Sequence, residues 1–252
     1  MDKIKQHFHN IKILTKLFFI PHKNSAVSTI FNSVGIPVCM MFFLTLVTGY
    51  SEDYFLRIVA GSVMMGMITM SISTVAVKIN NLVIGDGLEF FLAYSISKGE
   101  FVAGILSSLA TIYLSSNIFI LFIGMLLAKI EASILMIIAI YIMVFLLVTI
   151  AMLPIGVIIG FKCSNYNSTI SISNIISYVL IFFSPIYYDI QILPLGLQKL
   201  MGLLPTSFAS TMINNSFVGV FSFNHAMGGM LICLVWMIVG FGMVKRTLKW
   251  AL

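Results

Sequence analysis

The stretch ASILMIIAIYIMVFLLVTIAMLPIGVIIG, residues 132–160, contains no charged side chain. A helix that crosses a bilayer needs about 20 mostly apolar residues, and this stretch exceeds that length. Hydrocarbon offers no partner to free backbone N–H and C=O groups, so a continuous apolar run of this length predicts an α-helix. The stretch therefore predicts a transmembrane helix and, with it, a membrane protein.

The rest of the chain has the same character. Of its 252 residues, 60% are hydrophobic and only 9% are charged, an apolar share well above that of soluble domains. The sequence predicts an all-α polytopic membrane protein with a single transmembrane domain over residues 1–252. Its six uncharged runs, each a predicted transmembrane helix, are residues 27–47, 58–77, 101–127, 132–160, 169–188 and 226–244.

The positions of the basic residues predict the orientation of the chain. If the N-terminus lies in the cytoplasm, the cytoplasmic segments hold 11 of the 14 Lys and Arg residues, and only Arg57, Lys129 and Lys199 lie outside. Cytoplasmic loops of membrane proteins carry such an excess of basic residues. We therefore expect both termini in the cytoplasm. The net charge of +6 is explained by this bias, and no nucleic-acid partner is expected.

Residues 1–24 come before the first run. Apolar and basic residues recur in this segment with the period of an α-helix. Apolar side chains fall on one side of the predicted helix and basic ones on the other. We expect this leader helix to lie in the headgroup plane with its lysines toward anionic lipid; the alternative is a solvated basic leader that only sets topology. The apolar side holds Ile4, Phe8, Ile11, Leu14 and Phe18, and the basic side holds Lys5, His9, Lys12 and Lys16.

The segment GDGLEFFLAYSIS, residues 85–97, lies in the predicted cytoplasmic loop 78–100. Asp86 and Glu89 are three residues apart, as in a capping box at the start of a helix. The apolar residues that follow share one helical face. The segment therefore predicts a short capped helix with an apolar side; the alternative is an ordinary loop helix that lies against the bilayer.

Residues 185–225 form the longest segment between predicted spans. They are apolar enough to enter the membrane, but prolines and glycines divide them into pieces too short to cross it. We expect a re-entrant hairpin on the outer side, with Tyr187 and Tyr188 at headgroup level. The alternative is a further span. The breaks are at Pro185, Pro194, Gly196, Gly202 and Pro205.

Weakly polar residues recur at helical spacing within several predicted spans. Gly156-x-x-x-Gly160 and the small residues of spans two and three are typical of close helix packing. The fifth span carries larger polar side chains that cost more to bury. We interpret these as lining a translocation pathway or a subunit interface; the alternative is helix packing within the chain. They are Asn167, Ser171, Asn174 and Tyr178.

The sequence offers no energy source within the chain. None of the six predicted spans contains Asp, Glu, Lys, Arg or His, and ion-coupled transporters bind their ion through such residues. The motifs of intramembrane hydrolases are absent, as is the phosphate-binding loop of nucleotide hydrolases. Neither a metal site nor enzymatic activity is therefore expected. A partner subunit would have to supply the energy.

Two stretches resemble a known family. GLEFFLAYSISK, residues 87–98, is similar to the glycine-threonine-leucine-glutamate signature in the cytoplasmic loop of type-two exporter permeases of the ATP-binding-cassette transporters. SPIYY at 184–188, followed by Leu193-Pro194 and LPTSFA at 204–209, resembles the stretch after their fifth span. Two departures occur: Gly87 is not followed by threonine, and Ser95 replaces the usual proline.

The resemblance implies a transporter of two membrane subunits, identical or related, and two ATPase subunits in the plasma membrane of a bacterium. ATP and Mg²⁺ would bind to the ATPase subunits, and this chain would bind no cofactor. The segment 86–98 would couple to the ATPase, and the hairpin would gate the outer end of the pathway. The implied coupling residues are Asp86, Gly87, Leu88, Glu89, Phe90, Phe91 and Leu92. The implied gate residues are Pro185, Tyr187, Tyr188, Pro194 and Pro205.

The uncharged pathway residues favour an amphipathic or hydrophobic cargo such as a peptide, a drug or a lipid-like molecule. Export of a glycan chain is the alternative within the same family. A membrane sensor or immunity protein that binds a peptide without transporting it is the alternative from another class.

Overall fold

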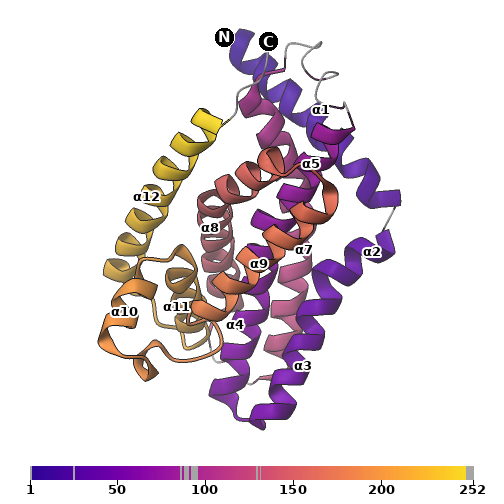
Figure 1. Ribbon diagram of the computed structural model, residues 1–252. Coiled ribbons are helices and arrows are strands. Elements are labelled where there is room, and N and C mark those ends of the chain that lie inside the picture. Colours follow the sequence, from indigo (N-terminus) through magenta and orange to yellow (C-terminus); the bar gives the residue numbers. More distant parts are fainter. Residues whose placement is uncertain are drawn as a thin grey trace.

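The structure is a bundle of helices (Figure 1), and the start of α1 and the end of α12 lie at the same end of it. The computed structural model describes residues 2–24, 26–85, 87, 91, 96–128, 130 and 132–247, and these ranges contain no strand. The all-α fold is therefore as predicted. The elements are α1 (Asp2–Asn24), α2 (Ala26–Ile30), the π-helical turn η1 (Phe31–Gly35), α3 (Ile36–Thr48), α4 (Glu52–Thr69), the π-helical turn η2 (Met70–Thr74), α5 (Val75–Ile84), α7 (Lys98–Leu127), α8 (Ile134–Lys162), α9 (Tyr166–Phe183), the 3₁₀ turn η3 (Ile190–Ile192), α10 (Leu195–Gly202), α11 (Pro205–Phe217) and α12 (Phe223–Thr247).

In the described part of the chain, six helices are long and apolar enough to cross a membrane. Each overlaps one of the six predicted runs, so the number and order of the candidate spans are confirmed. They are Phe31–Thr48, Glu52–Ile84, Gly99–Leu127, Ile134–Lys162, Tyr166–Phe183 and Phe223–Arg246.

The second of these helices differs most from its prediction. It runs without a break through α4, η2 and α5 for 33 residues. At about 1.5 Å per residue it is about 50 Å long, whereas the hydrocarbon core of a bilayer is about 30 Å thick. Its ends therefore extend past the predicted run at 58–77. Residues 78–84, predicted as the start of the cytoplasmic loop, are the last turns of α5.

This long helix is the centre of the bundle, and α8 packs along it. Two glycines make the approach close. A Cβ atom added to Gly156 would lie 2.5 Å from the carbonyl oxygen of Ser71, and one added to Gly160 would lie 2.7 Å from that of Ala76. Small residues let helix backbones approach in this way. The predicted packing role of the Gly156-x-x-x-Gly160 pair is confirmed.

The segment after α9 contains two short helices. The helix α9 ends at Phe183, directly before Ser184-Pro185, whereas the predicted run extends to residue 188. Pro194 caps the 8-residue α10, and Pro205 is the first residue of the 13-residue α11. Both helices are shorter than the about 20 residues that a crossing needs. Nearly all of α11 is buried, and it packs against α4 and α8.

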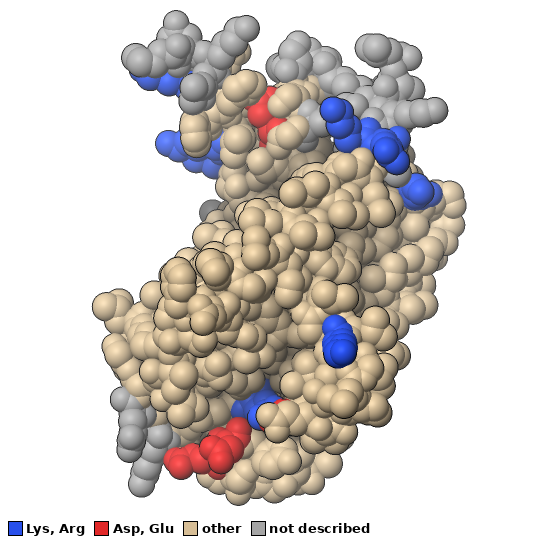
Figure 2. Space-filling view, turned by 90° about the vertical axis from the view of Figure 1, so that its left-hand side faces the viewer, with Lys and Arg blue, Asp and Glu red and all other residues tan. Residues whose placement is uncertain are grey.

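Charged side chains are unevenly distributed along the molecule. In Figure 2, which shows one face, several Lys and Arg side chains gather at the end of the bundle that carries both termini. A wide band with almost no charged side chain follows, and most of the acidic residues on this face lie toward the opposite end. A surface of this kind matches a molecule whose middle lies in hydrocarbon.

Candidate functional site: a polar cavity and its connection to the leader helix

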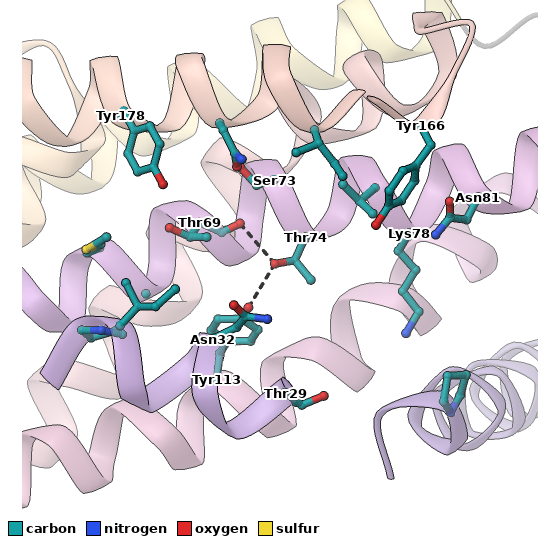
Figure 3. A pocket seen from close by; sticks show the side chains of 18 residues that line it. Thr29, Asn32, Thr69, Ser73, Thr74, Lys78, Asn81, Tyr113, Tyr166 and Tyr178 are labelled. Carbon is teal, nitrogen blue, oxygen red and sulfur yellow. Dashed lines mark hydrogen bonds between the residues drawn. The ribbon is translucent and has the colours of Figure 1, made fainter. Parts of the chain in front are cut away.

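A cavity of about 500 Å³ lies between α9, the α4–η2–α5 helix, α7 and the α2–η1 segment (Figure 3). Hydroxyl and amide side chains make up much of its wall, in a part of the bundle that is otherwise apolar. Ser73 and Tyr113 are buried, and several of the other polar residues are exposed to the cavity or the surface. Polar groups are costly within a membrane, and they mark pathways and binding sites there. The polar lining residues are Thr29, Asn32, Thr69, Ser73, Thr74, Lys78, Asn81, Tyr113, Tyr166, Asn174 and Tyr178.

The π-helical turn η2 supplies two of these side chains. The Oγ1 atom of Thr74 lies 3.0 Å from the phenol oxygen of Tyr113 on α7, and it also donates to the Thr69 carbonyl oxygen over 3.4 Å (Figure 3). The hydroxyl of Ser73 lies 2.9 Å from that of Ser177 on α9. Turns of this type are rare in helices and recur at functional sites. Here η2 connects the cavity wall to both neighbouring helices.

The structure brings two of the four predicted pathway residues to the cavity. Asn174 and Tyr178 line it, whereas Asn167 and Ser171 are exposed on other parts of α9. The face of α9 that does line the cavity consists of every fourth residue, Tyr166, Ile170, Asn174 and Tyr178. In Figure 3 the rings of Tyr166 and Tyr178 project from α9 toward the α4–α5 helix.

Lys78 is a cavity residue, although it falls at the start of the predicted cytoplasmic loop 78–100. It lies on α5, lines the cavity, and donates a hydrogen bond to the backbone carbonyl oxygen of Phe18 on the leader helix over 2.6 Å. Its ammonium group also lies 5.2 Å from the centre of the Phe18 ring. The predicted run 58–77 contains no ionisable residue, but the helix Glu52–Ile84 continues past that run and carries Lys78.

The leader helix α1 is bound to the start of α7 by a buried carboxylate. The backbone N–H of Ser97 donates to Glu100 Oε2 over 2.7 Å, and the Glu100 N–H donates to Ser97 Oγ over 3.3 Å. The other carboxylate oxygen of Glu100 accepts from Asn10 Nδ2 over 2.9 Å and lies 2.7 Å from His7 Nδ1. The Glu100 side chain is only 5% exposed. One carboxylate therefore caps α7 and holds α1 at the same time.

Aromatic packing extends this connection. The ring of Phe91 lies 5.6 Å from that of Phe18 on α1 and 5.2 Å from that of Phe101 on α7, measured between ring centres. A Cβ atom added to Gly104 would lie 2.5 Å from the Cβ atom of Leu14, so the two helices are in close contact. We call this set the leader junction: His7, Asn10, Leu14, Phe18, Phe91, Ser97, Glu100, Phe101 and Gly104.

The leader helix itself agrees in part with its prediction. Residues 2–24 are helical, and Lys5, His9, Lys12 and Lys16 are exposed. Leu14 and Phe18 are buried, but they pack against α7 and not toward an open surface. Phe8, assigned to the same apolar side, is 71% exposed. The apolar side of α1 is therefore used for contact within the chain over its second half.

Most of the predicted coupling residues lie outside the described residues. These are Asp86, Leu88, Glu89, Phe90 and Leu92, and the capping box predicted at Asp86 and Glu89 lies there too. Gly87 is half-buried near Leu82. Phe91 is 4% exposed, so its ring contacts the chain's own helices and does not face outward. The ATPase contact of the segment 86–98 stays a prediction.

The sequence contains the pattern of the capping box that Ser97 and Glu100 form in the structure. Ser97-Lys98-Gly99-Glu100 has the serine and the glutamate three residues apart, directly before the apolar run 101–127. That signal predicts a helix start at Ser97, but nothing local predicts that the same carboxylate reaches His7 and Asn10 on another helix.

The predicted gate residues lie near the other end of the bundle. Pro185 and Pro205 are buried, Tyr187 and Tyr188 are half-buried and Pro194 is exposed. The Tyr187 ring lies over Gly61 of α4, where an added Cβ atom would be 2.3 Å from it. Next to it, Arg57 Nη2 lies 3.2 Å from Asp189 Oδ2. The segment after α9 is therefore held against α4.

Within the described ranges, no three His, Cys, Asp or Glu side chains come together in a way that could hold a metal ion. No family model matches the chain, and no curated protein matches it significantly. Membership in the type-two exporter permeases therefore stays a proposal. It depends on the residue patterns quoted above and on the geometry of the cavity and the leader junction.

Proposed function

We propose that the chain is the membrane-spanning permease subunit of an ATP-driven exporter of the ATP-binding-cassette type. In this proposal it moves an amphipathic or hydrophobic cargo out of a bacterial cell. A second membrane subunit completes the pathway, and two ATPase subunits bind ATP and Mg²⁺. The chain binds neither and is not an enzyme by itself.

The observation that carries the proposal is the position of Phe91. It belongs to the segment that resembles the family's coupling signature, and its ring packs between α1 and α7. A displacement of this segment would therefore act on two helices together. Packed elements of this kind move as rigid bodies and not by gradual deformation.

A second contact extends the route from the leader junction to the cavity. Phe18 takes part in the aromatic cluster, and its carbonyl oxygen accepts a hydrogen bond from Lys78, which lines the cavity. Movement of α1 would change the position of a charged cavity residue directly. The proposal thus assigns the leader junction to energy input and the polar cavity to the cargo pathway.

In this proposal both termini lie in the cytoplasm and residues 185–225 form the re-entrant hairpin at the outer end. The hydroxyls of Ser184 and Thr206 are paired, and Ser210 donates to the Pro185 carbonyl oxygen over 3.0 Å. These bonds hold the two sides of the hairpin together. Arg57 and Asp189 would then form an outer latch that opens when cargo leaves.

The test is purification of the affinity-tagged chain from its native membrane in mild detergent. We expect a nucleotide hydrolase subunit to be retained in a fixed ratio, with ATP hydrolysis that depends on Mg²⁺. The test variant has the predicted contact residues Glu89 and Phe90 changed to alanine. It should insert into the membrane normally but lose the hydrolase. Retention of the hydrolase by this variant would contradict the coupling assignment, and isolation of the unchanged chain without any hydrolase would contradict the function.

A further inference from the structure

A second cavity, distinct from the polar one, forms a groove of about 370 Å³ between α7, α8 and α12. Each wall is one face of a helix, with Gly99, Val102, Ala103 and Leu106 on α7 spaced as a helical face requires. The seven residue-to-residue steps from Gly99 to Leu106 rise about 10 Å, so the groove runs roughly that far along the helix axes. The other lining residues are Ile150, Leu153, Val157, Phe241, Val244 and Lys245.

The walls of the groove are apolar apart from one end. A water molecule needs two to four polar partners to occupy a cavity, and apart from Lys245 the side chains that line the groove offer none. An empty groove would forfeit dispersion contacts along all three helices. The part of a hydrocarbon chain nearest its headgroup fits this space, and the bilayer that surrounds the candidate spans is its source.

The open end of the groove is basic. Lys245 lines it and Arg246 follows in the last turn of α12, at the end of the molecule that carries both termini. In the described part of the chain neither side chain makes an ion pair. The carboxylate of α7 is that of Glu100, one residue after Gly99. It is turned toward His7 and Asn10 and is 5% exposed. At Gly99 an added Cβ atom would meet nothing within 4 Å, which leaves room for a headgroup.

We propose that this groove binds one acyl chain of an anionic membrane phospholipid whose phosphate lies against Lys245 and Arg246. The apolar walls take the chain, and the two cations select the negatively charged headgroup over a zwitterionic one. The site is independent of the proposed transport function. It lies beside the leader junction, because Gly99 is next to Glu100, so a bound lipid supports α12 against the start of α7.

The experiment uses the purified full chain in detergent with two probes that have the same acyl chains, phosphatidylglycerol and phosphatidylcholine. Native mass spectrometry measures how much of each lipid stays bound. We expect one phosphatidylglycerol to be retained in preference to phosphatidylcholine. Lys245→Gln with Arg246→Gln should lower that preference about fivefold per charge removed. Ala103→Trp should fill the groove and remove the retained lipid of either kind.

Two controls match these changes. Lys162→Gln with Lys199→Gln removes two exposed charges outside the groove, and Thr111→Trp adds a tryptophan to an exposed position of α7; both should retain lipid like the unchanged chain. Equal retention of the two lipids by the unchanged chain would overturn the proposal. So would full retention by Ala103→Trp. If that variant does not fold, an unaltered preference in the charge variant overturns it as well.

Discussion

Lys78 on the central helix donates a hydrogen bond to the backbone carbonyl oxygen of Phe18 on the leader helix, with 2.6 Å between Nζ and O. The same lysine lines the polar cavity, and the same phenylalanine packs against Phe91 and Phe101. One side chain thus joins the leader junction to the cavity. The connection is charged and short, so its loss is measurable.

Replacing Lys78 by methionine keeps most of the side-chain volume but removes the donor. Hydrogen bonds from charged groups contribute about 1.5–3 kcal/mol, so the free energy of unfolding should fall by about 2 kcal/mol. Limited proteolysis of the leader helix in detergent checks the result, since a detached helix is cut faster. The control is Lys162→Met, an exposed lysine on α8. Equal cleavage of the two variants would show that the Lys78 bond does not hold α1.

The contact between Gly104 and Leu14 predicts a steric effect. Gly104→Val should push α1 away from α7, because even a Cβ atom there would lie 2.5 Å from Leu14 Cβ. Overpacking of this kind costs about 1–3 kcal/mol. Thermal unfolding of the purified chain measures the loss. Gly196→Val on the exposed α10, where an added Cβ meets nothing within 4 Å, should leave the midpoint close to that of the unchanged chain.

Two asparagines on α9 form a matched pair that tests the proposed cargo pathway. Asn174 lines the polar cavity, whereas Asn167 is exposed outside it. Asn174→Ala should reduce cargo export by about twofold to thirteenfold, the effect of about 0.5–1.5 kcal/mol from one hydrogen bond. Asn167→Ala should export like the unchanged chain. Cargo efflux from vesicles that contain the whole complex is the measurement, and equal efflux from both variants would remove α9 from the pathway.

Much of the fold follows from apolar run length alone. Six runs predict six long helices, because each run must satisfy its own backbone in hydrocarbon. The ends of the helices are harder to predict, since a helix can continue past its apolar run: α5 reaches Ile84, which places Lys78 in the bundle. The end of α9 shows the opposite error. Its apolar run continues beyond Phe183, but Pro185 prevents the helix from following it.

The sequence could predict only those parts of the candidate site that depend on the residue spacing within a single helix. The sequence predicted a polar face on α9, but a spacing of three or four residues fits several neighbouring faces, and only contact with α4 and α5 selects the one that includes Asn174 and Tyr178. The leader junction depends on contacts between residues about 90 positions apart, such as His7 and Glu100. Local patterns carry no information on such pairs, so the role of Glu100 was not foreseen.

The buried position of Phe91 predicts a loss of coupling without a loss of insertion. Phe91→Leu removes two aromatic contacts, each worth about 0.5–1.5 kcal/mol beyond the area that it buries. In the complex with the proposed ATPase subunits we expect ATP hydrolysis to continue while its stimulation by cargo falls. Phe119→Leu, at a phenylalanine of α7 that is 53% exposed, is the control. Unchanged stimulation in the Phe91 variant would separate the leader junction from energy input.

Cargo movement in sealed liposomes tests the central claim that the chain depends on an ATPase partner. One set of liposomes contains the purified chain alone with a proton or sodium gradient, and the other contains the chain with its co-purified ATPase, ATP and Mg²⁺. The account predicts cargo movement only in the second set, and none when ATP is omitted. Movement driven by the ion gradient in liposomes that contain only this chain would contradict it.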